Sequence, residues 1–198
     1  MSVPSALRAT APVNQGVRLF CMSKKLQILR GQDLQNRIDA LNESARLACE
    51  ALQRVCTQSN PINALASVKF NQLGLDPLDP HRPLNFIEQV NQTFTYLAAF
   101  RATKDLFSRH KDIDAFTLNL GNVGGWDIES SSTQQVVAEV FATVDPSNNQ
   151  KLNNDLKRVV TAPHEFKYVY FICPSIPPGR HSHRLATGNV IVWSLGPP

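Results

Sequence analysis

The 198-residue sequence lacks long apolar runs and has few charges. No apolar stretch approaches the roughly 18–20 residues that a membrane-spanning helix needs, so we expect no membrane partner. The beginning of the chain also lacks the apolar core of a secretory signal peptide. Charged residues make up 18% of the chain, and the formal net charge is +4. This mild basic excess is compatible with nucleic-acid binding but does not establish it.

Cysteine is scarce, with four residues and no C-x-x-C pair. None of the four has a histidine at the spacing of a zinc finger, which excludes the common structural zinc sites. Cys49 and Cys56 are seven residues apart on a predicted helix, too far for an easy disulfide. We therefore expect reduced, mostly buried thiols and a cytoplasmic protein. The four are Cys21, Cys49, Cys56 and Cys173.

Two nucleotide and hydrolase motifs are also missing. The chain has no G-x-S-x-G nucleophile elbow, which argues against a serine hydrolase of that type. The glycine-rich "GNVGG" at 121–125 lacks the Lys-Ser/Thr of a P-loop and does not precede a helix. We interpret it as a turn between strands.

Residues 1–32 contain five bases and no acid. This composition is typical of a basic arm or a transit peptide, but we favour a loosely ordered leader. Met22 is an alternative to Met1 as the true start. The bases are Arg8, Arg18, Lys24, Lys25 and Arg30.

Residues 33–83 are predicted to form a helical extension followed by a proline-rich connector. Apolar residues recur at alternating spacings of three and four along 34–55, with Asp33 as the N-cap. Such a stripe packs against a second helix, or it forms a homodimer through helix 33–57. Prolines and Gly74 then interrupt regular structure up to residue 83. The stripe comprises Leu34, Ile38, Leu41, Ala45, Ala48, Leu52 and Val55.

Residues 84–198 are predicted to form an α/β core. A helix at 84–110, capped by Asn85, carries apolar residues at helical spacing, after which the spacing becomes that of strands. The resulting order favours a mixed central β-sheet flanked by helices. The apolar helix residues are Ile87, Val90, Phe94, Leu97, Phe100 and Phe107. The later elements are strands at 113–121, 125–130 and 134–144, a helix at 151–162, and strands at 165–175 and 189–196.

Two carboxylates on neighbouring predicted strands are the best candidates for a chemical site. Asp127 begins one strand, and Glu139 lies among valines in the next. Glu139 shares a strand face with Val137, whereas Val136, Ala138 and Val140 point the other way. A buried acid needs a charge partner or a metal ion, and Mg²⁺ prefers carboxylate oxygen. The alternative without a chemical role is that Asp127 lies in a solvated turn and Glu139 is an acid on an edge strand.

The order of elements and the two acids resemble the PD-(D/E)XK nuclease-like superfamily over residues about 84–174. The resemblance implies a restriction-endonuclease-like core, with Asp127 and Glu139 as the catalytic, Mg²⁺-binding acids. It also implies that Glu88, on the helix before the sheet, assists with the metal. The expected activity is Mg²⁺-dependent cleavage of DNA.

The chain departs from this pattern at Phe141, where the family carries a lysine. An aromatic ring cannot stabilise charge on a phosphate. Either a lysine from the following helix replaces it, Lys151 before Lys157, or the protein is a catalytically inactive relative that binds nucleic acid or another protein. A third alternative is an α+β domain without nuclease ancestry, in which the acids are incidental.

Basic residues outside the acidic pair are candidates for nucleic-acid contacts. The loop "PPGRHSHRLATG" holds Arg180 and Arg184, which could contact phosphates, as could Lys157. His181 and His183 could bind a transition metal, but no third ligand lies nearby in sequence. A plain solvent-exposed loop explains the same residues.

Overall fold

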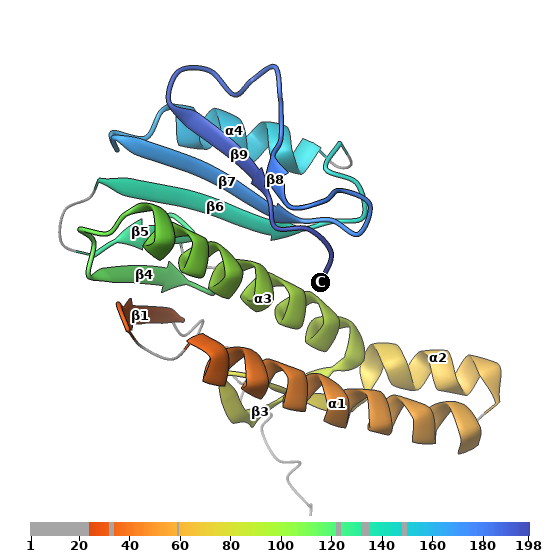
Figure 1. Cartoon of the computed structure of the whole chain (residues 1–198). Helices are drawn as coiled ribbons and strands as arrows, with labels where there is room; N and C mark the ends of the chain where they lie inside the picture. The colour runs from red at the N-terminus through yellow and green to blue at the C-terminus, as the bar shows by residue number, and fades with distance from the viewer. Residues whose placement is uncertain (1–23, 32–33, 59, 122–123, 132–134, 148–149) are drawn as a thin grey trace, which may run out of the picture.

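The alternating apolar residues after residue 113 form strands of a seven-stranded mixed sheet (Figure 1). This computed structural model describes residues 24–31, 34–58, 60–121, 124–131, 135–147 and 150–198. The strand order is β1-β4-β5-β6-β7-β9-β8, antiparallel from β1 to β6 and parallel from β6 through β7 to β9. The predicted α/β class, a mixed sheet flanked by helices, is confirmed. The strands are β1 Lys25–Leu29, β4 Ala115–Asn119, β5 Ile128–Ser130, β6 Val136–Ala142, β7 Phe166–Ile172, β8 Gly179–Arg180 and β9 Val190–Ser194.

Helices cover both faces of the sheet (Figure 1). Helix α3, Phe86–Arg109, packs on one face, and α1, Leu34–Gln58, packs along α3. Helix α4, Lys151–Val160, packs on the opposite face as the crossover between the parallel strands β6 and β7. Alternation along β6 serves both layers, because Val136, Ala138 and Val140 join the α3 core whereas Val137 and Phe141 join the α4 core.

Helix α3 begins as the sequence predicts, and its C-terminal half buries the predicted Phe100 and packs Leu97 and Phe107 against the core, whereas its first turns differ from the prediction. Asn85 accepts a hydrogen bond from the Glu88 backbone N–H, and Glu88 bonds back to the Asn85 N–H, completing a capping box. Ile87 and Val90, expected to be buried, are 50% and 37% exposed. Small residues let the next turns approach the sheet closely, and the inward side is Tyr96, Ala98, Ala99, Phe100, Ala102, Thr103 and Leu106.

Residues 25–29, which the sequence assigned to a loosely ordered leader, form the edge strand β1. Ile28 is fully buried against the α3 side of the sheet. Arg30 then donates hydrogen bonds to the carbonyls of Phe107 and Ile113, each at 3.0 Å, and to that of His110. The guanidinium thereby satisfies carbonyls around the end of α3 that the helix leaves free. The predicted cap Asp33 lies outside the described residues.

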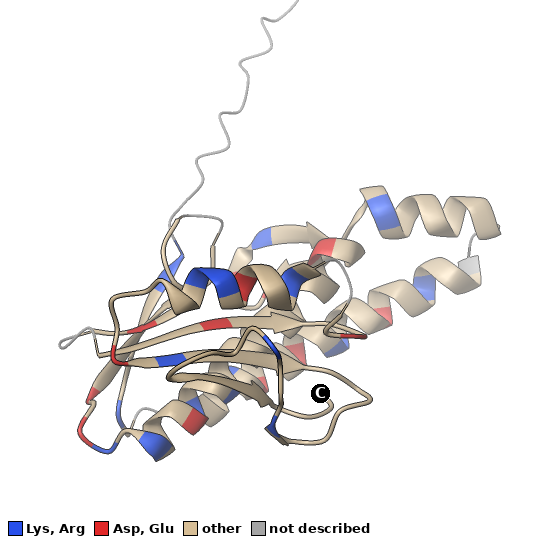
Figure 2. Ribbon diagram, turned by 90° about the horizontal axis from the view of Figure 1, so that it is seen from above, with Lys and Arg blue, Asp and Glu red and all other residues tan. Residues whose placement is uncertain are grey.

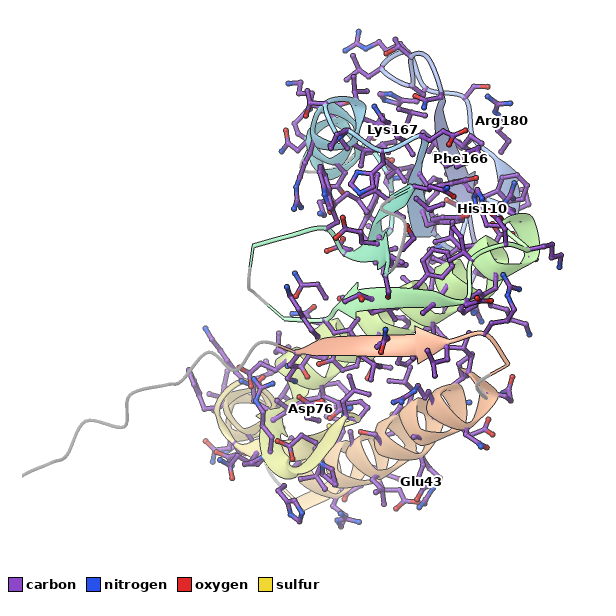
Figure 3. All side chains as sticks on the ribbon, turned by 90° about the vertical axis from the view of Figure 1, so that its left-hand side faces the viewer. Glu43, Asp76, His110, Phe166, Lys167 and Arg180 are labelled. Carbon is purple, nitrogen blue, oxygen red and sulfur yellow. The ribbon has the colours of Figure 1, made fainter. Side chains whose placement is uncertain are left out.

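The proline-rich connector also has more structure than its composition indicates. Asn60 caps α2, Pro61–Phe70, and Pro61 occupies the first turn, where a missing N–H is harmless. Strands β2, Gln72–Asp76, and β3, Asp79–Asn85, form a separate hairpin against α1 and α3. Buried Asp76 pairs with Lys24 and Arg82, and so ties this hairpin to the start of β1 (Figure 3).

The cysteine expectation is partly wrong. Cys173 is buried, but Cys49 and Cys56 are exposed on α1, and all three are free thiols. Cys49 and Cys56 fall on the outer side of α1, away from the Leu34, Leu41 and Ala48 stripe.

Across the described residues, every helix is too short or too polar to cross a lipid bilayer.

Candidate functional site

Asp127, the residue just before β5, lies close to Glu139 on the adjacent antiparallel strand β6. Ile128 pairs with Ala138 across β5 and β6, so the next position of the same register places Asp127 against Glu139. Cross-strand neighbours share a face and have Cβ atoms about 5 Å apart. The Asp127 carboxylate is close enough to Glu139 to raise the pKa of the Glu139 carboxyl. The structure therefore brings the predicted pair together, on the α4 side of the sheet.

The surroundings of the pair differ for its two members. Asp127 Oδ2 accepts a hydrogen bond from the Val140 backbone N–H at 2.9 Å, which fixes the carboxylate at the end of β6. Glu139 is only 1% exposed. Burial, reinforced by the Asp127 charge, raises the pKa of Glu139 to about 9.

A third carboxyl group and a lysine come to the same place from α4. Asp155 is buried, and burial raises the pKa of its carboxyl against the opposing effect of Lys151. Lys151 Nζ donates to Asp155 Oδ1 at 2.7 Å. The same ammonium lies 5.8 Å from the centroid of the Phe141 ring. Lys151 thus lies beside the Phe141 ring, on the α4 side of the sheet.

Arg158, one turn beyond Asp155, is the second cation of the site. Its Nη1 lies 2.8 Å from Glu139 Oε1, and its guanidinium lies 4.6 Å from the centroid of the Trp126 ring. Nη2 donates to the Gly125 carbonyl. The arginine therefore crosses from α4 to the turn that precedes Asp127.

Two buried carboxyl oxygens of the site lack a hydrogen bond. Glu139 Oε1 and Asp155 Oδ2 are buried oxygens without a hydrogen bond, because the contact of Arg158 with Glu139 lacks hydrogen-bond geometry. Buried oxygens of this kind are uncommon, and a bound ion is one of the explanations for them. No three His, Cys, Asp or Glu side chains in the described part of the chain are grouped tightly enough to hold a metal alone. A Mg²⁺ ion here would use two carboxylates and complete its octahedron with water or phosphate oxygen.

Glu88 does not join this group. It belongs to the first turn of α3, in the capping box with Asn85, and α3 covers the sheet face opposite to α4. The structure therefore gives Glu88 a helix-capping role, and its predicted role as a metal ligand has no geometric support.

The predicted nucleic-acid contacts are exposed but scattered. Lys157 lies on the outside of α4, Arg180 on the edge strand β8, and Arg184 in the loop before β9. Arg180 is three strands from β6, about 14 Å at the usual spacing between strands. Figure 2 shows basic positions on α4 directly over the sheet, with acidic positions among them. Among these three basic residues, only Lys157 lies on the same element as an acid of the site, since α4 also carries Asp155.

Each of the two loop histidines contacts a different part of the protein. His181 packs edge-on against the Phe171 ring, with centroids 5.4 Å apart, and His183 Nδ1 accepts a hydrogen bond from the Leu185 backbone N–H. Together with Arg180 they line a cavity of about 230 Å³. The predicted loop is therefore more ordered than expected, since Gly179–Arg180 form the edge strand β8.

Sequence reasoning missed Asp155 and Arg158. A signal for Asp155 was present, because it falls on the apolar stripe of α4 formed by Leu152, Leu156 and Val159. An acid on a buried stripe requires a partner. Arg158 carried no such signal, since its role depends on the turn at Gly125 and Trp126, far away in sequence.

Comparisons with protein-family models, with curated proteins and with solved structures found no match to this chain. Its function must therefore be argued from the site rather than from relatives.

Proposed function

We propose that this protein is a Mg²⁺-dependent phosphodiesterase that cleaves nucleic acid, with an active site of the PD-(D/E)XK type. One observation supports the proposal: the Asp127 and Glu139 carboxyl groups and Lys151 lie on the α4 side of the sheet, beside buried oxygens that lack hydrogen bonds. The order of helix, three antiparallel strands, crossover helix and parallel strand from α3 to β7 agrees with the same family.

Each residue of the site has a role that follows from its position. Asp127 and Glu139 would hold the ion, which polarises the phosphate and lowers the pKa of bound water. The Val140 N–H keeps Asp127 in place. Lys151, over Phe141, offers a positive charge to the phosphate, and Asp155 positions that ammonium. In this proposal the Phe141 ring packs against the Lys151 ammonium and takes no part in the reaction.

Binding of nucleic acid without cleavage is the second candidate. Phe141 stands where the family carries a lysine, and the Arg158 guanidinium already lies 2.8 Å from Glu139 Oε1. A site used only for binding would keep the basic residues Lys157, Arg180 and Arg184 but would need no metal. A homodimer through helix 33–57 also stays a prediction, since α1 uses its stripe against α3 in the single chain.

The first prediction compares Asp127→Ala and Glu139→Ala with the unchanged protein. We expect Mg²⁺-dependent cleavage of a plasmid and of single-stranded DNA, and at least a hundredfold loss in each variant, because charge stabilisation by such groups contributes that much. Asp112→Ala removes an exposed acid elsewhere and serves as the control. Gel electrophoresis of the products gives the rates.

Equal cleavage by all four proteins would exclude this site. Absence of cleavage together with tight, Mg²⁺-independent DNA binding would favour the second candidate. Lys151→Ala separates the two further, because we expect it to abolish cleavage while DNA binding weakens only slightly.

A further inference from the structure

Arg158 has a position that the proposed reaction does not explain. It contacts Glu139, the Trp126 ring and the Gly125 carbonyl at once, yet 43% of its side chain is exposed. The Glu139 carboxyl it faces is 1% exposed. One end of the contact is therefore fixed in the interior, whereas the other can reach solvent.

The contact between Arg158 and Glu139 is close but incomplete. The two atoms are 2.8 Å apart, yet Glu139 Oε1 accepts no hydrogen bond. If Arg158 only stabilised the fold, we would expect its planar guanidinium to donate two well-aligned hydrogen bonds to the Glu139 carboxylate. The missing alignment leaves this oxygen available to another cation.

The other two contacts of Arg158 involve the turn that leads into Asp127. Stacking on Trp126 and donation to Gly125 hold the guanidinium beside the acidic pair without help from Glu139. If a cation takes Glu139, the guanidinium therefore stays close by with free donors. Two or more N–H groups of arginine match the oxygens of a phosphate.

We propose that Arg158 is a phosphate-binding residue that rests on Glu139 while the site lacks a metal ion. When a divalent cation occupies Glu139, Arg158 turns its free N–H groups to a backbone phosphate of the nucleic acid. This inference depends on the proposed function. It assigns substrate contact to a residue on α4 next to Lys157, whereas Lys151 faces the reacting phosphate.

The inference can be tested without measuring cleavage, through the salt dependence of DNA binding. A dye-labelled 20-base-pair duplex is titrated with the unchanged protein and with Arg158→Gln, in MgCl₂ and in EDTA, and its length is checked on a gel afterwards. With Mg²⁺ we expect Arg158→Gln to bind about tenfold more weakly, and its plot of log K against log salt to be shallower by about one. In EDTA we expect equal affinities, because Arg158 is then engaged by Glu139.

Control variants distinguish this role from general charge and from folding. Arg46→Gln removes a positive charge from α1, where Arg46 pairs with Glu43 and Glu50, and should leave the Mg²⁺-dependent slope unchanged. Arg158→Lys keeps the positive charge but loses the planar guanidinium. We therefore expect the salt dependence of its DNA binding to match that of the unchanged protein, and its DNA affinity to lie between those of Arg158→Gln and the unchanged protein. Circular dichroism verifies that each variant is folded.

Tryptophan emission gives a second readout, because the chain has only Trp126 and Trp193. In a Trp193→Phe background, Mg²⁺ should change the emission of Trp126, and adding Arg158→Gln should remove that change. Mg²⁺ binding is first measured by calorimetry, with Glu139→Ala as reference. If Mg²⁺ does not bind at Glu139, the proposed function and this inference both fail.

If Mg²⁺ binds but the emission of Trp126 stays constant, and the salt slopes of Arg158→Gln and the unchanged protein agree, only the role of Arg158 is wrong. An equal loss of affinity with Mg²⁺ and with EDTA would also overturn it, since Arg158 would then contribute charge regardless of the metal.

Discussion

At the scale of single residues, Glu139 determines how the site responds to pH. Its pKa of about 9 in the folded chain is far above the value of about 4.3 for an exposed glutamate. Between these values the folded chain keeps a proton that the unfolded chain has released. Folding stability contributed by this residue therefore falls as the pH rises from about 5 to 9.

Glu139→Gln should remove this pH dependence, because glutamine resembles the protonated side chain and cannot ionise. We expect the free energy of unfolding of the variant to exceed that of the unchanged protein by about 1–3 kcal/mol at pH 8.5, and the difference to shrink towards pH 5. Urea denaturation at several pH values measures it. Glu165→Gln, at an exposed position, is the control. Parallel stability curves for Glu139→Gln and the unchanged protein would contradict the assignment.

The sequence predicted the two acids but not their full environment. Asp127 and Glu139 were identifiable because strand alternation is regular, and an acid among valines is conspicuous. The proximity of Lys151 to Phe141 could be predicted from chain order, since α4 is the next element after β6. Arg158 could not, because its contacts join α4 to a turn more than thirty residues away.

At the scale of elements, two glycines flank β9 and differ in what surrounds them. Gly188 and Gly196 both have positive φ, +64° and +79°. A side-chain Cβ at Gly188 would meet nothing within 4 Å, whereas one at Gly196 would lie 2.7 Å from Cγ of Pro178. The proline ring cannot move away as a flexible side chain would.

We therefore expect Gly196→Ala to destabilise the protein more than Gly188→Ala. The left-handed backbone costs alanine about 1 kcal/mol in both variants, and the contact with Pro178 adds about 1–3 kcal/mol in the first alone. Thermal and urea denaturation measure the difference. Equal losses would show that the loop before β8 adjusts freely.

The elements themselves were predictable where a regular period is long. The strands from β4 to β7 and the helices α3 and α4 follow directly from spacing. The hairpin of β2 and β3 was missed because Pro80 and Pro83 oppose strand structure, and a two-stranded hairpin tolerates them where a central strand would not. Strand β1 was missed because five residues with one buried side chain carry little periodic signal.

At the scale of the whole molecule, the segment from Lys24 to Arg30 connects parts that are distant in sequence. Lys24 pairs with Asp76, Ile28 is buried beneath α3, and Arg30 binds carbonyls around the end of α3. A chain that starts at Met22 keeps all these contacts. A chain that starts at Gly31 loses them and exposes the edge of β4.

We expect the chain starting at Gly31 to be less stable by at least about 3 kcal/mol, because a buried ion pair is broken and a core residue is lost. It should also aggregate more readily, since β4 would become an unprotected edge. The chain starting at Met22 is the control, and denaturation with light scattering gives both readouts. Equal stability of the two truncated proteins would contradict the role assigned to β1.

The pairing of β1 with β4 has a consequence for biosynthesis. Arg30 contacts carbonyls 77 to 83 residues further along the chain. At about 5–20 residues per second, a ribosome needs roughly 4–17 s to supply those carbonyls after it has made Arg30. Strand β1 therefore remains unpaired until β4 has been synthesised. A chaperone that shields nascent chains could bind β1 during this interval.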